Sequence, residues 1–113
     1  MKIFHNPRCS KSRETLAILK DKGLEVEIVE YLNNVPNKTE LKEILAKLGV
    51  KAEDLLRKKE LVFKENFKGK TLSEEEWIEA MIQFPKLIER PIVIEGNRAI
   101  IGRPPEKVLD LID

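Results

Sequence analysis

The sequence predicts an α/β fold in which a β-α-β unit is followed by a run of helices and then by a β-β-α unit. The spacing of apolar residues changes from about two to about 3.6 along the chain and later returns to two, with Pro, Gly and Asn between the segments. The chain has 113 residues, of which 42% are hydrophobic. That length supplies one hydrophobic core, so we expect a single domain over residues 1–113.

The first third of the chain predicts the β-α-β unit. Residues 2–4 are apolar and end at a His-Asn-Pro segment, which is typical of a short strand followed by a loop. Apolar residues over 10–22 recur near the helical period, and Gly23 marks the end of that helix. Residues 25–31 alternate charged with β-branched or aromatic side chains, which predicts a strand with one buried face. A right-handed crossover should make the two strands parallel.

The middle of the chain is predicted to be helical. A helix is expected to begin at residue 37 or 38 and to end before Gly49, and a shorter one should follow over 52–56. Ser73 and Glu76 have the spacing of a capping box, so they should begin a further helix that ends before Pro85.

The last third returns to a strand pattern. Residues 91–95 and 98–102 are two β runs separated by Gly-Asn, which predicts a hairpin. Two prolines at 104 and 105 then lead into an apolar pattern that runs to residue 112, where we expect a terminal helix.

Charge and cysteine content limit the classes of partner. The 21 Lys and Arg residues nearly balance the 20 Asp and Glu residues, so nothing indicates nucleic acid or a membrane surface. The N-terminal segment has no apolar signal region, and no apolar stretch is long enough to span a bilayer. One cysteine cannot form an internal disulfide, and a free thiol favours a reducing compartment. We expect a cytoplasmic monomer.

Cys9 is the candidate nucleophile. It lies at the start of the helix predicted over 10–22, where unpaired N–H groups favour a thiolate and can bind an anion. Arg8, Lys11 and Arg13 add positive charge, and Ser12 places a hydroxyl three positions after the thiol. A buried structural cysteine is the alternative, but a polar junction rich in Arg and Lys favours reactivity.

Four further residues are candidates whose roles the residues alone leave open. His5 could support the thiolate as an imidazolium or end the first strand. Arg57 lies in a basic run that is typical of a solvated surface. Arg90 and Arg103 each precede a proline, which favours extended backbone and a defined turn. Spacing by itself does not unite these side chains in one site.

Four segments together resemble the glutaredoxin-coupled arsenate reductase family of the ArsC/Spx superfamily. They are H-N-P-R-C-S-K-S-R at 5–13, L-L-R-K at 55–58, R-P-I-V at 90–93 and G-R-P at 102–104. Their order and spacing match over nearly the whole chain. The resemblance implies a thioredoxin-like fold with a helical insertion between the second and third strands. The core would then comprise residues 1–34 and 89–113, the insert 35–88, and Pro91 would be a cis-proline.

The resemblance also implies roles for the candidate residues. Cys9, Ser12 and His5 would be the catalytic residues, with Cys9 as the nucleophile and Ser12 and His5 close to the thiol. Three arginines would converge on the bound oxyanion: Arg57, Arg90 and Arg103. The implied reaction is reduction of arsenate to arsenite, with glutathione as co-substrate, glutaredoxin as partner, no tightly bound cofactor and no metal. Because the chain has one cysteine, an outside thiol must complete the reduction.

The motif around Cys9 differs from that of one branch of the family. The plasmid-type reductases resemble H-N-P-A-C-G-T-S-R, whereas this chain has Arg8, Ser10 and Lys11 and is similar to the chromosomal branch.

Two alternatives share the same architecture. A glutathione-dependent thiol reductase with another substrate would use the same residues. Spx-type regulators, which bind the RNA polymerase α subunit, often carry C-x-x-C, and this chain has C-x-x-S with all three arginines. Some regulators also carry C-x-x-S, so it is the full set of three arginines that favours the enzyme.

Overall fold

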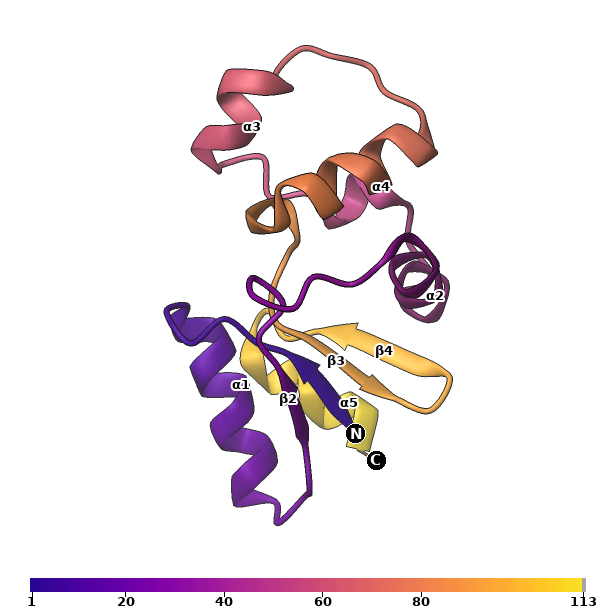
Figure 1. Ribbon diagram of the computed structural model, residues 1–113. Helices are drawn as coiled ribbons and strands as arrows, with labels where there is room; N and C mark the ends of the chain where they lie inside the picture. The colour runs from indigo at the N-terminus through magenta and orange to yellow at the C-terminus, as the bar shows by residue number, and fades with distance from the viewer. Residues whose placement is uncertain (113) are drawn as a thin grey trace. The chain divides into compact units, whose positions relative to one another are not determined.

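The computed structural model describes residues 1–112 and shows an α/β architecture with the predicted order of elements (Figure 1). The strands are β1 (Lys2–Phe4), β2 (Glu27–Val29), β3 (Ile92–Glu95) and β4 (Arg98–Ile101). The α-helices are α1 (Ser10–Asp21), α2 (Lys38–Leu48), α3 (Leu61–Asn66), α4 (Glu74–Gln83) and α5 (Leu109–Ile112). The 3₁₀ helices are η1 (Ala52–Leu55), η2 (Pro85–Leu87) and η3 (Pro105–Val108).

The chain divides into two compact units. The first combines Met1–Asn34 with the described residues from Arg90 onward, and the second is Val35–Glu89. The first unit therefore contains all four strands with α1 and α5, and the second contains α2, α3 and α4.

The sheet of the first unit has the strand order β2-β1-β3-β4. Strand β1 pairs with β2 in parallel, with Ile3 opposite Ile28, and with β3 in antiparallel, with Ile3 opposite Val93. The parallel pair joined through α1 confirms the predicted β-α-β unit. Strand β3 pairs with β4 as an antiparallel hairpin. Gly96 begins its two-residue turn with φ of 59°, a left-handed value that glycine adopts without a Cβ clash.

One face of this sheet carries the core of the first unit. Helices α1 and α5 cover that face (Figure 1), and five buried side chains meet there. They are Ile3, Leu19, Val93, Val108 and Leu111. Each buried aliphatic side chain of this kind contributes about 1.5 to 3 kcal/mol. This packing fixes α1 against the sheet and so fixes the position of the residues at its N-terminus.

Strand β2 is shorter and more exposed than predicted. It spans Glu27–Val29 instead of residues 25–31, and it lies at the edge of the sheet. The predicted burial of one face is wrong for Ile28, whose relative exposure is 43%. An edge strand has a neighbour on one side only, so alternation of side chains does not by itself bury its apolar face.

The helices of the second unit begin and end largely at the predicted signals. Asn37 and Glu40 form a capping box at α2, and Gly49 ends that helix with φ of 72°. Ser73 and Glu76 form the predicted capping box at α4. The short helix expected over 52–56 is the 3₁₀ helix η1.

Helix α3 was not predicted, because its sequence has no start signal. Its N-cap, Glu60, makes no side-chain hydrogen bond to the first turn. The helix instead forms through packing: the Phe63 ring stacks on Trp77 at a centroid distance of 6.1 Å, and Phe67 lies 5.9 Å from both Trp77 and Phe84. Tertiary contacts of this kind often decide whether a helix of six residues forms.

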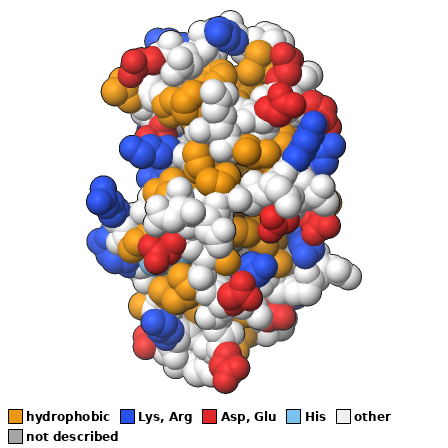
Figure 2. Space-filling view, viewed as in Figure 1, with side chains coloured by type: hydrophobic (Ala, Val, Ile, Leu, Met, Phe, Trp, Pro, Cys, Tyr) orange, Lys and Arg blue, Asp and Glu red, His pale blue; other side chains and the backbone are white. Residues whose placement is uncertain are grey.

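Charged side chains of both signs are interspersed with apolar ones on the face shown in Figure 2. This mixture agrees with the formal net charge of +1. Within residues 1–112, every helix is too short or too polar to cross a bilayer.

Candidate active site

Cys9 is the N-cap residue of α1. Its backbone is extended, with φ of −92° and ψ of 122°, and its carbonyl accepts the first helical hydrogen bond, from Arg13 N–H at 3.0 Å. The Cys9 N–H donates to the carbonyl of Asn6 at 2.9 Å, which closes a tight turn before the helix. Cys9 is partly exposed.

Two side chains hold the turn that presents Cys9. The Asn6 Oδ1 accepts a hydrogen bond from the Arg8 N–H at 3.0 Å, in the manner of an Asx turn. The Arg13 Nη1 donates to the Pro7 carbonyl at 2.9 Å. Arg13 therefore contacts the backbone of the loop, although the sequence indicated only a cation near the thiol.

Ser12 and His5 form a buried pair behind this turn. Ser12 is fully buried, and its Oγ lies 2.6 Å from His5 Nδ1 while it accepts from the Asn6 N–H at 3.0 Å. Burial lowers the pKa of His5, and nearby Arg13 and Lys20 act in the same direction, against an opposing effect of Glu30. A lowered pKa favours a neutral imidazole, which can accept the Ser12 hydroxyl proton in a hydrogen bond.

Arg103 and Arg90 bring positive charge to the thiol from the far end of the sequence. The Arg103 Nη2 donates to Cys9 Sγ at 3.4 Å, and its Nε donates to the Arg90 carbonyl at 2.8 Å. Gly102 N–H donates to the Pro91 carbonyl at 3.0 Å. The Arg90–Pro91 bond is cis, as the family resemblance implied, and the Arg103–Pro104 bond is cis as well, which was not predicted.

These neighbours set the ionisation of Cys9. Partial burial raises the pKa of the thiol, but the Ser12 backbone N–H, Arg90 and Arg103 together lower it below its ordinary value. The Ser12 amide acts from the first turn of α1, although the thiol makes no full capping hydrogen bond. The sequence predicts the position of Cys9 at the start of this helix, and the structure confirms it. The guanidinium groups that act on the thiol come from positions 90 and 103, not only from its neighbours in the sequence.

Arg57 lies in the second unit and is not the solvated surface residue that its basic run indicated. Its side chain is 20% exposed, its Nη1 donates to Glu89 Oε1 at 2.5 Å, and its Nε lies 3.5 Å from Glu60 Oε1. Its N–H donates to the Leu87 carbonyl at 2.7 Å. These contacts hold Arg57 in one orientation. Its convergence with Arg90 and Arg103 on an oxyanion stays a prediction.

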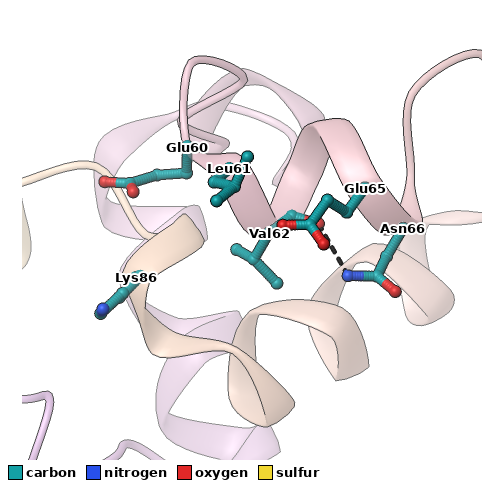
Figure 3. Close-up of a pocket in the computed structure, with 6 residues that line it drawn as sticks. All are labelled: Glu60, Leu61, Val62, Glu65, Asn66 and Lys86. Atoms are coloured by element: carbon teal, nitrogen blue, oxygen red, sulfur yellow. Dashed lines mark hydrogen bonds between the residues drawn. The ribbon is translucent and has the colours of Figure 1, made fainter.

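The second unit also contains a pocket of about 350 Å³ (Figure 3). Its lining residues are Glu60, Leu61, Val62, Glu65, Asn66 and Lys86. The Asn66 Nδ2 donates to the Val62 carbonyl, so this side chain is engaged within α3. The lining includes none of the candidate site residues. Across residues 1–112, no group of three or more His, Cys, Asp or Glu side chains is placed to hold a metal.

Comparison with known proteins gives the family. Residues 4–111 match the profile of the ArsC family. The chain belongs to the ArsC family. An Escherichia coli K12 relative called uncharacterized protein YfgD is 51% identical, over 99% of this chain and 96% of its own. The arsenate reductase of Haemophilus influenzae is 46% identical, over 97% of both chains.

A solved structure supports the assignment of the fold. The arsenate reductase from Vibrio cholerae has a TM-score of 0.92 and 45% identity, over 97% of each chain. This agreement with an ArsC-family structure confirms the predicted thioredoxin-like fold, with the helices of the second unit inserted between β2 and β3.

Proposed function

We propose that this ArsC-family chain reduces arsenate to arsenite, with the Cys9 thiolate as nucleophile. The contact of Arg103 Nη2 with Cys9 Sγ at 3.4 Å is the observation that carries the proposal. It places a permanent cation beside a thiol whose pKa is lowered. A partly exposed thiolate flanked by guanidinium groups suits attack on a tetrahedral oxyanion. Relatives at 42% and 46% identity are named arsenate reductases, which supports the same substrate.

In the first step, Cys9 Sγ forms a bond to arsenic and one arsenate oxygen leaves as water. Negative charge on the remaining oxygens is then stabilised by guanidinium donors, which form charge-assisted hydrogen bonds in planar pairs. Arg90 and Arg103 already flank the sulfur. We assign Arg57 to the same oxyanion on the family pattern, with Glu60 and Glu89 holding its guanidinium in orientation.

The second step needs a thiol from outside the chain. Reducing arsenic(V) to arsenic(III) takes two electrons, which two thiols supply when they join as a disulfide. The chain contributes one thiol, Cys9. We propose that glutathione supplies the second, that arsenite leaves, and that glutaredoxin returns the resulting mixed disulfide to thiols. This requirement for reduced thiols also favours a cytoplasmic location.

Ser12 and His5 are assigned to positioning and not to proton transfer. The Ser12 hydroxyl is engaged by His5 and by the Asn6 N–H, all within the buried base of the loop. Burial keeps the pKa of His5 low, so the ring is a poor source of positive charge for the thiolate. In this assignment the pair fixes the first turn of α1 and so fixes Cys9.

Arsenite production from arsenate in the presence of glutathione and glutaredoxin tests the proposal. The wild type should produce arsenite, and Cys9→Ser should produce none, because a serine hydroxyl is not ionised at neutral pH. Ser10→Ala, which alters an exposed neighbour of Cys9, is the matched control and should retain turnover. Omitting glutathione should also stop turnover after the first step.

Failure of the wild type to release arsenite would reject the arsenate assignment. If the same protein reduced glutathione mixed disulfides, it would be a thiol reductase with another substrate. Capture of the RNA polymerase α subunit without any turnover would instead assign the chain to the regulators.

A further inference from the structure

Gly102 differs from the other glycines of the described chain. Gly23, Gly49, Gly69 and Gly96 have positive φ, and a Cβ at any of them would meet nothing within 4 Å. Gly102 has no left-handed φ, yet a Cβ there would lie 2.6 Å from Thr15 Oγ1 and 2.9 Å from Pro91 Cγ. Its glycine therefore serves a close approach and not a turn.

The atoms that Gly102 approaches cannot easily retreat. Thr15 is fully buried, and its Oγ1 donates to the Lys11 carbonyl one turn earlier in α1 at 2.8 Å. Pro91 is also buried, and its carbonyl accepts the Gly102 N–H at 3.0 Å. Non-bonded carbon atoms normally remain about 3.5 to 4 Å apart. A side chain at position 102 would therefore displace the segment that contains Gly102.

That segment leads directly into Arg103. The Arg103 N–H donates to the Ile101 carbonyl at 2.9 Å, so the backbone on both sides of Gly102 is tied down. From this fixed backbone, Arg103 donates to the Arg90 carbonyl and reaches Cys9 Sγ at 3.4 Å. A shift of a few tenths of an ångström at Gly102 moves the guanidinium relative to a thiol that is fixed on α1.

We propose that Gly102 is a positioning residue whose lack of a side chain lets its segment pack on Thr15 and Pro91 and so sets the separation of the Arg103 guanidinium from Cys9 Sγ. The inference deepens the proposed function, because it rests on Cys9 being the nucleophile. The contact between α1 and the turn from β4 to η3 then has a role in the chemistry as well as in stability.

The test measures the pKa of Cys9 from its alkylation rate against pH, in folded protein and without arsenate. Gly102→Ala should raise the pKa by about 0.5 to 1 unit, because the thiolate loses part of a nearby opposite charge. A residue with a structural role alone would lower the melting temperature and leave the pKa of the folded protein unchanged. An unchanged pKa would therefore overturn the proposal.

Second-site variants show whether the effect acts through Thr15. Thr15→Ala removes Oγ1 and Cγ2, two of the three atoms that a Cβ at 102 would meet, and leaves Pro91 Cγ. The pKa should therefore increase in the order T15A, G102A/T15A, G102A. Thr15→Ser keeps Oγ1, so G102A/T15S should remain close to G102A. Rescue by serine as complete as by alanine would contradict the assigned contact.

If Gly102→Ala alone fails to fold, comparing the Cys9 pKa of G102A/T15A with that of T15A still tests the proposal, because the contact of a Cβ at 102 with Pro91 Cγ at 2.9 Å remains. Equal pKa values in those two variants would overturn the proposal. Arsenate turnover is measured separately. Absence of turnover in the wild type would reject the proposed function and leave the result on Gly102 interpretable.

Discussion

Arg103 donates a hydrogen bond to the thiol of Cys9, which lies 94 positions earlier in the chain. The same guanidinium donates from Nε to the Arg90 carbonyl at 2.8 Å. One nitrogen therefore fixes the side chain while another faces the sulfur. The planar fork of arginine allows this division, and the single ammonium of lysine does not.

Arg103→Lys should therefore impair the site even though it keeps the charge. The lysine side chain lacks the two guanidinium donors, Nε and Nη2, that contact the Arg90 carbonyl and the thiol. We therefore expect the pKa of Cys9 to rise and kcat/KM for arsenate to fall by about 10- to 1000-fold. Steady-state kinetics and thiol alkylation measure the two effects. Arg98→Lys is the control, since Arg98 is exposed and donates to the Asp110 carbonyl. Equal kinetics in the wild type and Arg103→Lys would show that charge alone suffices.

The pH dependence of alkylation should place the Cys9 midpoint below that of a free thiol. The Ser12 amide, Arg90 and Arg103 outweigh the effect of burial, and their net effect lowers the pKa. The thiolate then persists as pH falls below about 8.5, and the rate reaches its plateau at a lower pH. Glutathione alkylated in parallel gives the reference curve. A Cys9 midpoint at or above the reference would contradict this prediction.

The order of elements was predictable because it depends on local signals. Periodicity, the Ser73–Glu76 capping box and the Gly-Asn turn at Gly96 each depend on a few neighbouring residues. Helix α3 was missed because aromatic packing stabilises it, and no cap marks its start. The exposure of Ile28 was missed because alternation does not reveal which strand lies at the edge of the sheet.

The candidate site also depends on contacts between distant residues, which local sequence signals do not predict. The position of Cys9 before a helix followed from its own neighbours. The proximity of Arg90 and Arg103 to its sulfur depends on the hairpin returning to α1, which residue spacing does not reveal. Only the family resemblance connected them in advance. The crowding at Gly102 was not foreseen, because a glycine before an arginine carries no sign of a close contact with Thr15.

Ser12→Ala should destabilise the protein by about 1 to 3 kcal/mol. Ser12 Oγ accepts from the Asn6 N–H and contacts His5 Nδ1, so its removal leaves two buried polar groups without a partner. Urea unfolding followed by circular dichroism measures the loss. Ser10→Ala is the matched control, because Ser10 is exposed at the first position of α1. A loss in Ser12→Ala no larger than that in the control would show that water or a rearrangement satisfies both groups.

His5 should make the folded protein less stable as the solution becomes acidic. Burial lowers its pKa in the folded state below the ordinary value of 6.5. Once the pH falls below about 6.5, the unfolded chain binds a proton that the folded protein does not, so the free energy of unfolding decreases. The loss continues until the pH passes the lower, folded-state pKa.

His5→Asn removes this titration while keeping a polar side chain that can bond to Ser12. Urea unfolding at a series of pH values from 7.5 to 5 should therefore give a steeper decrease in wild type than in the variant. Glu75 and Glu76 also have lowered pKa values, through Lys38 and the Ser73 cap respectively, but their ordinary value is 4.5. They act at lower pH and are present in both proteins. If the free energies of unfolding of the two proteins changed in parallel between pH 7 and 5.5, His5 would titrate alike in the folded and unfolded states. Burial would then not explain a neutral His5 imidazole next to Ser12.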